Sequence, residues 1–291
     1  MKLSIGTIKS DRKGFETLAE VFKTARDLSL DTLNLDFSSC SFFEGNMAAP
    51  FYAILSQVFN GLNEISVVNV PDDVEKILRK NQFFCVFGYT AIHDHNQTTL
   101  PFKKFKLQAG DQFSDYLDQY LKGKGLPEMT YALTKKFRQS LLEIFQNSAI
   151  HSDSASGIFT CGQFFPKKQR IDFTIADAGI GIRENVRRYH GDAKISSRDA
   201  IRWGLTEGNT TRKGGNQPGG LGLKLIKDFI RLNQGKIQII SRFGFYQYSA
   251  SGELLLKMDK DFPGTSVNIE INTGDTNSYR LKSELKVDDI F

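Results

Sequence analysis

The chain has 291 residues, of which 40% are hydrophobic and 24% charged, as in an ordinary soluble protein of one large or two modest domains. Its formal net charge of +5 comes from 38 basic and 33 acidic residues spread along the chain, so charge alone does not indicate a nucleic-acid partner. Cys40, Cys85 and Cys161 form no CxxC pair, which argues against a disulfide framework or a zinc site. The sequence has neither an apolar leader nor a run of roughly 18 apolar residues, so we expect a cytoplasmic protein with no membrane segment.

The first third of the chain alternates strand and helix patterns. Apolar and polar residues alternate over 33–37, and a short apolar run occupies 65–70, so both segments are predicted strands. Residues 47–59 and 72–84 carry helical patterns. Together these elements predict a small α/β domain over residues 1–105.

A polar stretch with a proline, residues 93–106, predicts the boundary between two domains. Residues 106–126 are expected to hold a linker helix, and residues 127–275 a second α/β domain. Residues 276–291 are polar and are predicted to form a loose C-terminal tail. The fold class expected from the sequence is therefore a two-domain α/β protein.

The second domain shows both helix and strand signals. Helical patterns occupy 127–151, 182–190, 196–205 and 221–233. Strand patterns occupy 158–165, 170–177 and a closing set between 236 and 272. A loop rich in glycine, threonine and asparagine, residues 206–220, separates the third helix from the fourth.

The long helix over 127–151 carries the first candidate site residues. Glu143 and Asn147 are four residues apart, so they share one face of the helix. A carboxylate in such a position can polarise a water molecule, and an amide oxygen can ligate a hard cation. A solvated helix face without a function is the simpler interpretation of this pair taken alone.

A second motif, Asp177-Ala-Gly179-Ile-Gly181, directly follows the strand over 170–177. Glycines allow the backbone to approach a ligand or to adopt positive φ, and a carboxylate at a strand end can accept a hydrogen bond from an exocyclic amine. A tight turn is the alternative explanation. The spacing lacks the third glycine of a dinucleotide-binding fingerprint, and the chain has no P-loop.

The third motif is the loop over 206–220, which runs into the N-terminus of a helix. Glycine-rich backbone in that position suits phosphate groups, whereas a flexible surface loop is the alternative. A fourth element, Gly264-Thr265, precedes the closing strand and means little alone. The candidate ligand contacts of the loop and the helix start are Thr210, Thr211, Arg212, Gly219, Gly220, Leu221, Gly222 and Leu223.

In this order, the four segments resemble the N box, the G1 box, the ATP lid with its G2 box, and the G3 element of the GHKL superfamily. That superfamily includes gyrase-type topoisomerases, Hsp90, MutL and the ATPase domains of histidine kinases. The resemblance covers roughly residues 127–272, about half of the chain. It implies a Bergerat α/β sandwich, in which helices pack on one face of a mixed, mainly antiparallel sheet, and a site for ATP with Mg²⁺.

The resemblance also implies a role for each residue of the N box. Glu143 would be the general base that orients the attacking water. Asn147 would bind the Mg²⁺ ion that bridges the phosphates. His151 matches a histidine that often closes the N box in anti-sigma-type members, although a structural histidine is the simpler assignment.

The other boxes would hold the base and the phosphates. Asp177 would accept a hydrogen bond from the adenine amino group, and Thr265 would support that contact. Gly179 and Gly181 would let the backbone close over the base. In the lid, Gly220 and Gly222 would present backbone amides to the phosphates.

The N-terminal region resembles STAS domains of the anti-sigma-antagonist type in its order of strand, short loop and helix. Those domains carry a phosphoacceptor serine where the loop enters the helix. Here the loop, residues 43–46, contains no serine, and Ser38, Ser39 and Ser41 lie earlier. This departure argues against a phosphorylation switch in the loop, and another kind of small α/β domain is the alternative.

Two further features are open to a functional interpretation. His93 and His95, with Asp94 between them, could ligate a metal, but a polar linker is the preferred explanation. Trp203 is expected in the core.

Three functions stay open. The first is an ATPase-like regulatory switch in which ATP orders the lid, residues 206–220, and so changes contacts with the STAS-like domain or an effector protein. The second is a serine kinase of the anti-sigma-factor type that phosphorylates a STAS partner. The third is a scaffold that binds ATP without hydrolysing it, against which Glu143 argues. A protein partner is expected in each case, and a homodimer is considered as well.

Overall fold

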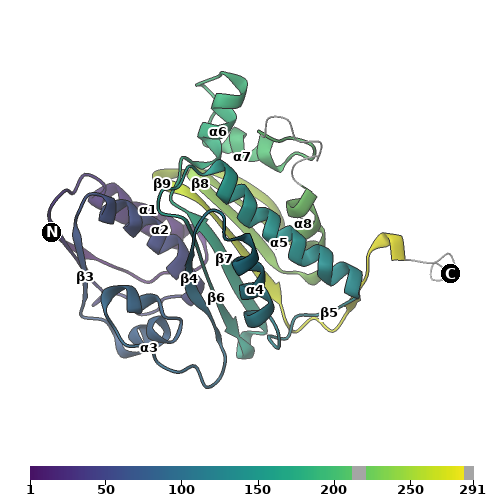
Figure 1. The fold of residues 1–291 in the computed structure, drawn as a ribbon, viewed down its shortest axis with the longest axis horizontal. Helices are drawn as coiled ribbons and strands as arrows, with labels where there is room; N and C mark the ends of the chain where they lie inside the picture. Colours follow the sequence, from purple (N-terminus) through teal and green to yellow (C-terminus); the bar gives the residue numbers. More distant parts are fainter. Residues whose placement is uncertain (212–220, 285–291) are drawn as a thin grey trace.

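The computed structural model describes residues 1–211 and 221–284, and a five-stranded sheet lies at its centre (Figure 1). The strands lie in the order β4 (Thr99–Phe105), β6 (Ile158–Phe165), β7 (Arg170–Asp177), β9 (Gly252–Asn272) and β8 (Lys236–Ser249). All four neighbouring pairs are antiparallel. Over the described residues the sheet is therefore wholly antiparallel, rather than mixed as the sequence led us to expect.

Three helices cover one face of this sheet (Figure 1). They are α4 (Gly110–Tyr120), α5 (Tyr131–His151) and α8 (Leu221–Asn233). Phe113 of α4 stacks on Phe145 of α5 with ring centroids 4.4 Å apart, and Phe137 of α5 meets Phe229 of α8 at 5.1 Å. These rings join isoleucine and phenylalanine side chains of the sheet in one buried core.

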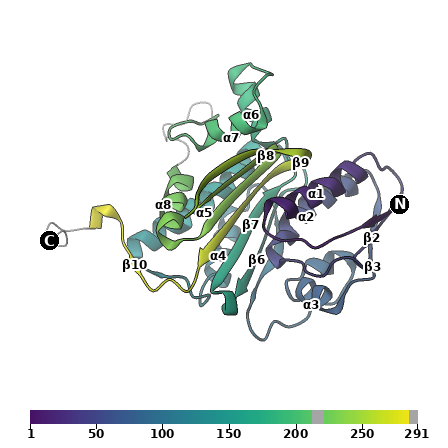
Figure 2. The same ribbon diagram turned by 180° about the vertical axis from the view of Figure 1, so that it is seen from behind.

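The N-terminal region covers the opposite face (Figure 2). Two helices, α1 (Arg12–Ala25) and α2 (Ala48–Asn60), separate the large sheet from a parallel sheet of β1 (Lys2–Ser4), β2 (Thr32–Asp36) and β3 (Glu64–Val68). Phe15 of α1 lies 6.3 and 6.5 Å from the ring centroids of Phe262 and Phe245 in the large sheet. Helices therefore cover both faces of the sheet, whereas the sequence predicted helices on one face.

The predicted boundary needs correction, because part of it belongs to the large sheet. Residues 99–105 form β4, which pairs with β6 at the edge of the large sheet. The N-terminal unit therefore ends before residue 99 and not at residue 105 as predicted. Leu100 and Phe105 are buried in the core, although polar neighbours hide their pattern in the sequence. Pro101 is tolerated because an edge strand does not need every N–H group for pairing.

The segments expected to be a linker and a loose tail are also packed. Residues 106–126 contain α4, whose Phe113 and Leu117 are buried. A short strand, β10 (Ser278–Tyr279), pairs with β5 (Glu128–Met129), and the Thr130 hydroxyl donates a hydrogen bond to Glu284. Of the predicted tail 276–291, the residues up to 284 thus dock beside the start of α5, and 285–291 lie outside the described residues.

The remaining helices are α3 (Asp72–Lys80), α6 (Gly181–His190) and α7 (Ser197–Leu205); α3 is shorter than the helix predicted over 72–84. The 3₁₀ turns η1 (Gly45–Met47), η2 (Phe83–Phe87), η3 (Pro166–Lys168) and η4 (Lys282–Glu284) were not predicted. The predicted helices at 182–190 and 196–205 and the strands at 158–165 and 170–177 are confirmed. Ser196 caps α7 by accepting a hydrogen bond from the backbone N–H of Asp199. No helix in the described ranges is long and apolar enough to cross a membrane.

The loop that enters α2, residues 43–46, is pressed against the large sheet. Asn46 is fully buried, and its side-chain nitrogen lies 2.7–3.1 Å from side-chain oxygens of Ser10, Thr174 and Asn268. The loop therefore holds the N-terminal region to the sheet and is not a free surface segment.

Candidate functional site

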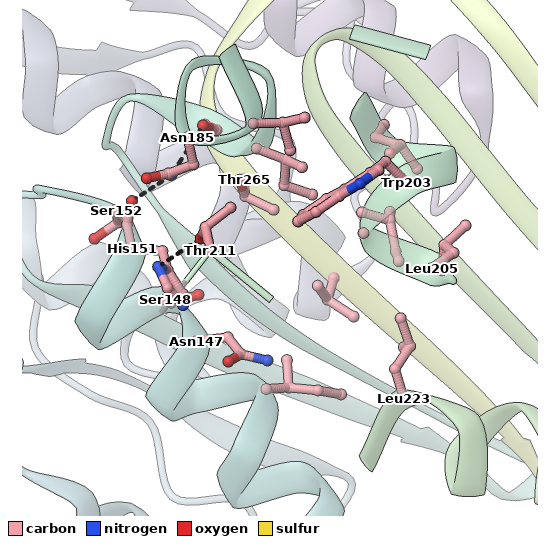
Figure 3. A pocket seen from close by; sticks show the side chains of 18 of the residues that line it. Asn147, Ser148, His151, Ser152, Asn185, Trp203, Leu205, Thr211, Leu223 and Thr265 are labelled. Carbon is pink, nitrogen blue, oxygen red and sulfur yellow. Dashed lines mark hydrogen bonds between the residues drawn. The ribbon is translucent and has the colours of Figure 1, made fainter. Parts of the chain in front are cut away.

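A cavity of about 180 Å³ opens at one end of α5 (Figure 3). Its wall is formed by α5, neighbouring positions of β7 and β9, the short helices α6 and α7, the loop over 209–211 and the start of α8. The apolar part of the lining includes Ile144, Ile182, Ile201, Ile239 and Val267. Apolar walls with a few placed polar groups are typical of small-molecule sites.

The cavity brings together half of the fourteen site residues that the sequence singled out. Those in its lining are Asn147, Asp177, Gly181, Thr210, Thr211, Leu223 and Thr265. Glu143 and Gly179 are not part of the lining. Leu221 and Gly222 are the first two residues of α8, whereas Arg212, Gly219 and Gly220 lie outside the described residues.

Asp177 ends β7 and is the most buried charged group of the cavity, with 2% of its surface exposed. Its Oδ1 atom accepts hydrogen bonds from the backbone N–H groups of Gly179, at 3.0 Å, and Thr265, at 3.3 Å. Burial raises the pKa of this carboxyl to about 6, although these two bonds and one from the Ser148 side chain oppose the rise. At neutral pH the group is thus mainly ionised.

The glycines beside Asp177 are required by the packing of the turn itself. A Cβ atom on Gly179 would lie 1.8 Å from the carbonyl oxygen of Ser152, far inside contact distance. Gly264 has φ +81°, and a Cβ there would lie 2.1 Å from the carbonyl oxygen of Asp177. Gly181 lines the cavity with φ +78°. Of the two G1-type glycines, only Gly181 is therefore placed to approach a ligand, whereas Gly179 allows two protein segments to meet.

The last turn of α5 supplies the polar wall. Asn147 and His151, one turn apart, line the cavity with Ser148 between them (Figure 3). The hydroxyl of Thr211 lies 3.2 Å from Nδ1 of His151, and Asn185 of α6 donates to the carbonyl oxygen of His151. His151 thus links α5 both to α6 and to the loop that precedes residue 212.

Glu143 lies one helical turn before Asn147 on α5 and is partly buried. Its neighbour Ile144 reaches the lining, but Glu143 does not. A group in this position could act on a molecule only beyond the cavity's edge, on the side away from Asp177. Asp177, at the end of β7, and Asn147 of α5 thus line the cavity, whereas Glu143 lies one turn before Asn147 and outside the lining.

Trp203 corrects a sequence expectation. The sequence places it in the core, but it is only partly buried and lines the cavity from α7 (Figure 3). Its ring lies 5.4 Å from that of Tyr189 and 5.2 Å from that of His190, both on α6. A single tryptophan in a helical pattern carries no signal that separates a core position from a cavity wall.

Ser241 of β8 lies outside the lining but supports two residues of it, and the sequence analysis does not identify it. Its Oγ lies 3.0 Å from the hydroxyl of Thr265 and accepts a hydrogen bond of 2.9 Å from the backbone N–H of Ile182, at the start of α6. Ser241 therefore fixes α6 relative to β9. Isolated serines in a strand are common, so no pattern distinguishes this one beforehand.

No family model matches the chain, and a search of curated proteins finds no match.

Proposed function

We propose that this chain binds ATP with Mg²⁺ in the cavity at the end of α5, as a GHKL-type protein with a Bergerat fold, and acts as an ATPase-like regulatory switch. The observation that carries the proposal is convergence. Asn147, Asp177, Thr211 and Thr265 come from four separate segments that were selected by their resemblance to the four boxes, and all four line one cavity.

The buried end of the cavity suits adenine. Asp177 is ionised at neutral pH, and its Oδ1 is already engaged by two backbone N–H groups, which leaves the carboxylate oriented as an acceptor. Adenine offers an amino donor at the corresponding edge, whereas guanine offers a carbonyl acceptor that the carboxylate would repel. Apolar side chains such as Ile182 and Ile239 provide flat walls for a ring.

The open end suits the phosphates and the metal. Asn147 is exposed and lines the cavity, so its amide oxygen is accessible to Mg²⁺ and would supply one of the metal's ligands. Magnesium usually keeps several waters and binds one or two protein oxygens together with substrate phosphates, so a single amide is an adequate protein ligand. Glu143, further along α5, is the group we assign to orient a water at the γ-phosphate.

A serine kinase remains the alternative function, and the loop over 43–46 bears on it. This loop has no hydroxyl, and its Asn46 is fully buried against the large sheet. A STAS-type acceptor would therefore have to be a separate protein. The third possibility, an ATP-binding scaffold, requires no role for Glu143.

Trp203 gives a direct assay, because it is the only tryptophan of the chain and it lines the cavity. We expect ATP and ADP to change its fluorescence saturably and GTP to leave it unchanged at the same concentration. Asp177→Asn should weaken ATP about 10-fold and Asp177→Ala up to about 100-fold, since a hydrogen bond to a charged group contributes about 1.5–3 kcal/mol.

Asp259→Asn is the matched control, because Asp259 is an exposed carboxylate on β9 outside the cavity. It should bind ATP like the wild type. Equal binding of ATP and GTP, or undiminished ATP binding by Asp177→Ala, would refute the proposed base recognition.

Product analysis with γ-labelled ATP separates the three functions. Free labelled phosphate identifies an ATPase, label on an added STAS protein identifies a kinase, and unchanged ATP identifies a scaffold.

A further inference from the structure

A second cavity, of about 550 Å³, lies on another part of the molecule and shares no lining residue with the first. It is bounded by the end of α3, the loop over 91–97, the start of β4 and the segment from the end of α4 to Lys124. Its volume falls within the roughly 300–1,000 Å³ of typical ligand pockets. Nothing in the assignment of the nucleotide site uses it.

The charges in this cavity are unbalanced. Lys80, Lys122 and Lys124 line it against a single carboxylate, Asp94. Lys80 forms an ion pair of 3.3 Å with Asp94, which neutralises one of the three positive charges. The two remaining ammonium groups leave a surplus of positive charge in the lining.

Lys124 is unusual because only 5% of its surface is exposed. Lysine is rarely buried to this extent, since removing an ammonium group from water is costly. Its Nζ donates to the carbonyl oxygen of Gln97, and Asp94 attracts it, but burial still lowers its pKa. An ammonium group has three donors, and the one hydrogen bond given for Nζ in the described residues goes to Gln97, while Lys124 itself lines the cavity.

The loop beside Lys124 is held in a defined conformation. Asp94 accepts hydrogen bonds from the backbone N–H of Thr99, at 2.7 Å, and from its hydroxyl, at 2.9 Å. Gln82 and Gln97, both in the lining, have φ of +65° and +49°, a left-handed conformation that is uncommon for residues other than glycine. The lining is therefore shaped by specific contacts rather than by loose surface side chains.

We propose that this cavity binds a small multivalent anion, a phosphorylated or polycarboxylate metabolite. Lys122 at the rim and the buried Lys124 would hold its anionic groups, and the lining glutamines would bind its hydroxyl or carbonyl groups. The competing explanation is purely structural: Lys80 and Lys124 only anchor the loop to Asp94 and Gln97, and no anion enters.

Histidine ring NMR tests the proposal, because the four histidines of the chain include one in each cavity, His93 here and His151 in the nucleotide site. Citrate and pyrophosphate are titrated separately up to about 10 mM, which detects dissociation constants near 1 mM. We expect one of them to shift the His93 resonances saturably. A response to citrate alone identifies a polycarboxylate, and a response to pyrophosphate alone identifies a phosphorylated ligand.

Two lysine variants provide the specificity control. Lys122→Met should weaken binding about 3- to 10-fold, the effect of one lost exposed charge contact. Lys103→Met should leave it unchanged, because Lys103 is also exposed, on β4, but lies outside the cavity. Three results would overturn the proposal. The His93 resonances could stay unchanged with both anions, the shifts could be confined to His151, or wild type and Lys122→Met could bind with equal affinity.

Discussion

The two faces of the five-stranded sheet are both buried, but they are built from different side chains. On β7, Phe173 and Ile175 pack towards α4, α5 and α8, on what we term the α5 face. Asp172 and Thr174, which alternate with them, point to the face covered by α1 and α2, the α2 face. Such alternation ordinarily indicates one buried and one solvated face, which agrees with the one-sided helix layer that the GHKL resemblance implied, yet both faces are covered here.

Several polar groups of the buried α2 face are matched to one another, whereas Oδ1 of Asn46 and Oγ of Ser266 have no hydrogen-bond partner among the described residues. The Thr174 hydroxyl donates to Asn268 at 2.7 Å, and Asn268 donates to Gln238 at 3.0 Å. Asn46, from the loop before α2, completes the network. An unmatched buried polar group would cost about 1–3 kcal/mol, so this face is stable only with the right partner.

A charged cluster extends the network. Arg170 of β7 pairs with Glu44 of the N-terminal loop, with Asp172 at 3.1 Å and with Glu270 at 3.2 Å. Burial raises the pKa of Asp172, and the negative charges of Glu270 and Glu44 add to the rise, while Arg170 opposes it. The two faces thus differ in what they carry: the cavity lies at one end of the α5 face, and the α2 face makes the contact with the N-terminal region.

The largest predicted effect belongs to the α5 face. Glu143→Ala should slow ATP turnover by about 10²–10⁴-fold and leave ATP affinity nearly intact, because a general base contributes to the reaction and not to binding. Turnover is measured as phosphate release and affinity by Trp203 fluorescence. The control is Gln146→Ala, because Gln146 is exposed on the same helix and lies outside the cavity lining, and it should retain wild-type turnover. Equal turnover in wild type and Glu143→Ala would remove the catalytic assignment.

The next effect concerns the α2 face. Asn46→Ala removes the side chain that reaches Ser10, Thr174 and Asn268, and we expect the free energy of unfolding to fall by about 1–3 kcal/mol. Asn60→Ala, at the exposed end of α2, should change it by less than about 0.5 kcal/mol. Both are measured by urea denaturation. Similar small losses in the two variants would show that the polar network does not hold the N-terminal region.

These contrasts also explain what the sequence could reveal of the fold. The strands over 158–165 and 170–177 follow clear patterns and lie where the sequence places them. Strand β4 escapes prediction because Pro101, Phe102, Lys103 and Lys104 separate its buried Leu100 and Phe105, so apolar and polar residues do not alternate. The polar face of a strand can meet either solvent or a matching polar surface. Which of the two it meets depends on distant residues such as Asn46, and no local sequence pattern contains that information.

The candidate site divides in the same way. Asp177 and Asn147 are recognisable because they lie in short motifs with characteristic neighbours, and both line the cavity. Ser241 and Trp203 cannot be recognised in the sequence, because each contributes to the site through contacts that exist only after folding. The resemblance implies that the backbone at Gly179 closes over the adenine ring. In the structure Gly179 instead packs against Ser152, and a glycine motif alone cannot distinguish these two roles.

One contact joins the two faces, and it gives a smaller effect. The Gln57 side chain of α2 donates a hydrogen bond to the carbonyl oxygen of Ala178, the residue that follows Asp177. Gln57→Leu keeps the bulk and removes the donor. We expect ATP affinity to fall about 3- to 10-fold, because the net value of such a bond is about 0.5–1.5 kcal/mol and Asp177 would be less well positioned.

The readout for Gln57 is ATP titration beside thermal unfolding of the ligand-free protein. Asn60→Ala, near the end of the same helix, should bind ATP like the wild type. An unchanged ATP affinity in Gln57→Leu would mean that the α2 face does not influence the nucleotide site. A lowered unfolding temperature with normal ATP binding would assign Gln57 to stability alone.

The smallest predicted effect is the pH dependence of ATP binding, and it distinguishes the two buried aspartates. The pKa of Asp177 is about 6, raised chiefly by burial, and only its ionised form is a full acceptor for the adenine amino group. Between pH 7 and pH 6 the ionised fraction falls from about nine-tenths to about one-half. If the protonated group binds ATP about tenfold more weakly, as expected of Asp177→Asn, ATP affinity should fall just under twofold, and about fivefold by pH 5. Because phosphate groups also titrate near pH 6, the quantity to measure is the ratio of wild-type to Asp177→Asn affinity at each pH. That ratio should decline as the pH is lowered, since Asp177→Asn has no carboxyl to protonate.

Asp172→Asn, on the α2 face, should retain the wild-type decline. A ratio that stays constant from pH 7 to pH 5 would show that the charge of Asp177 does not contribute to nucleotide binding, whatever the cavity holds.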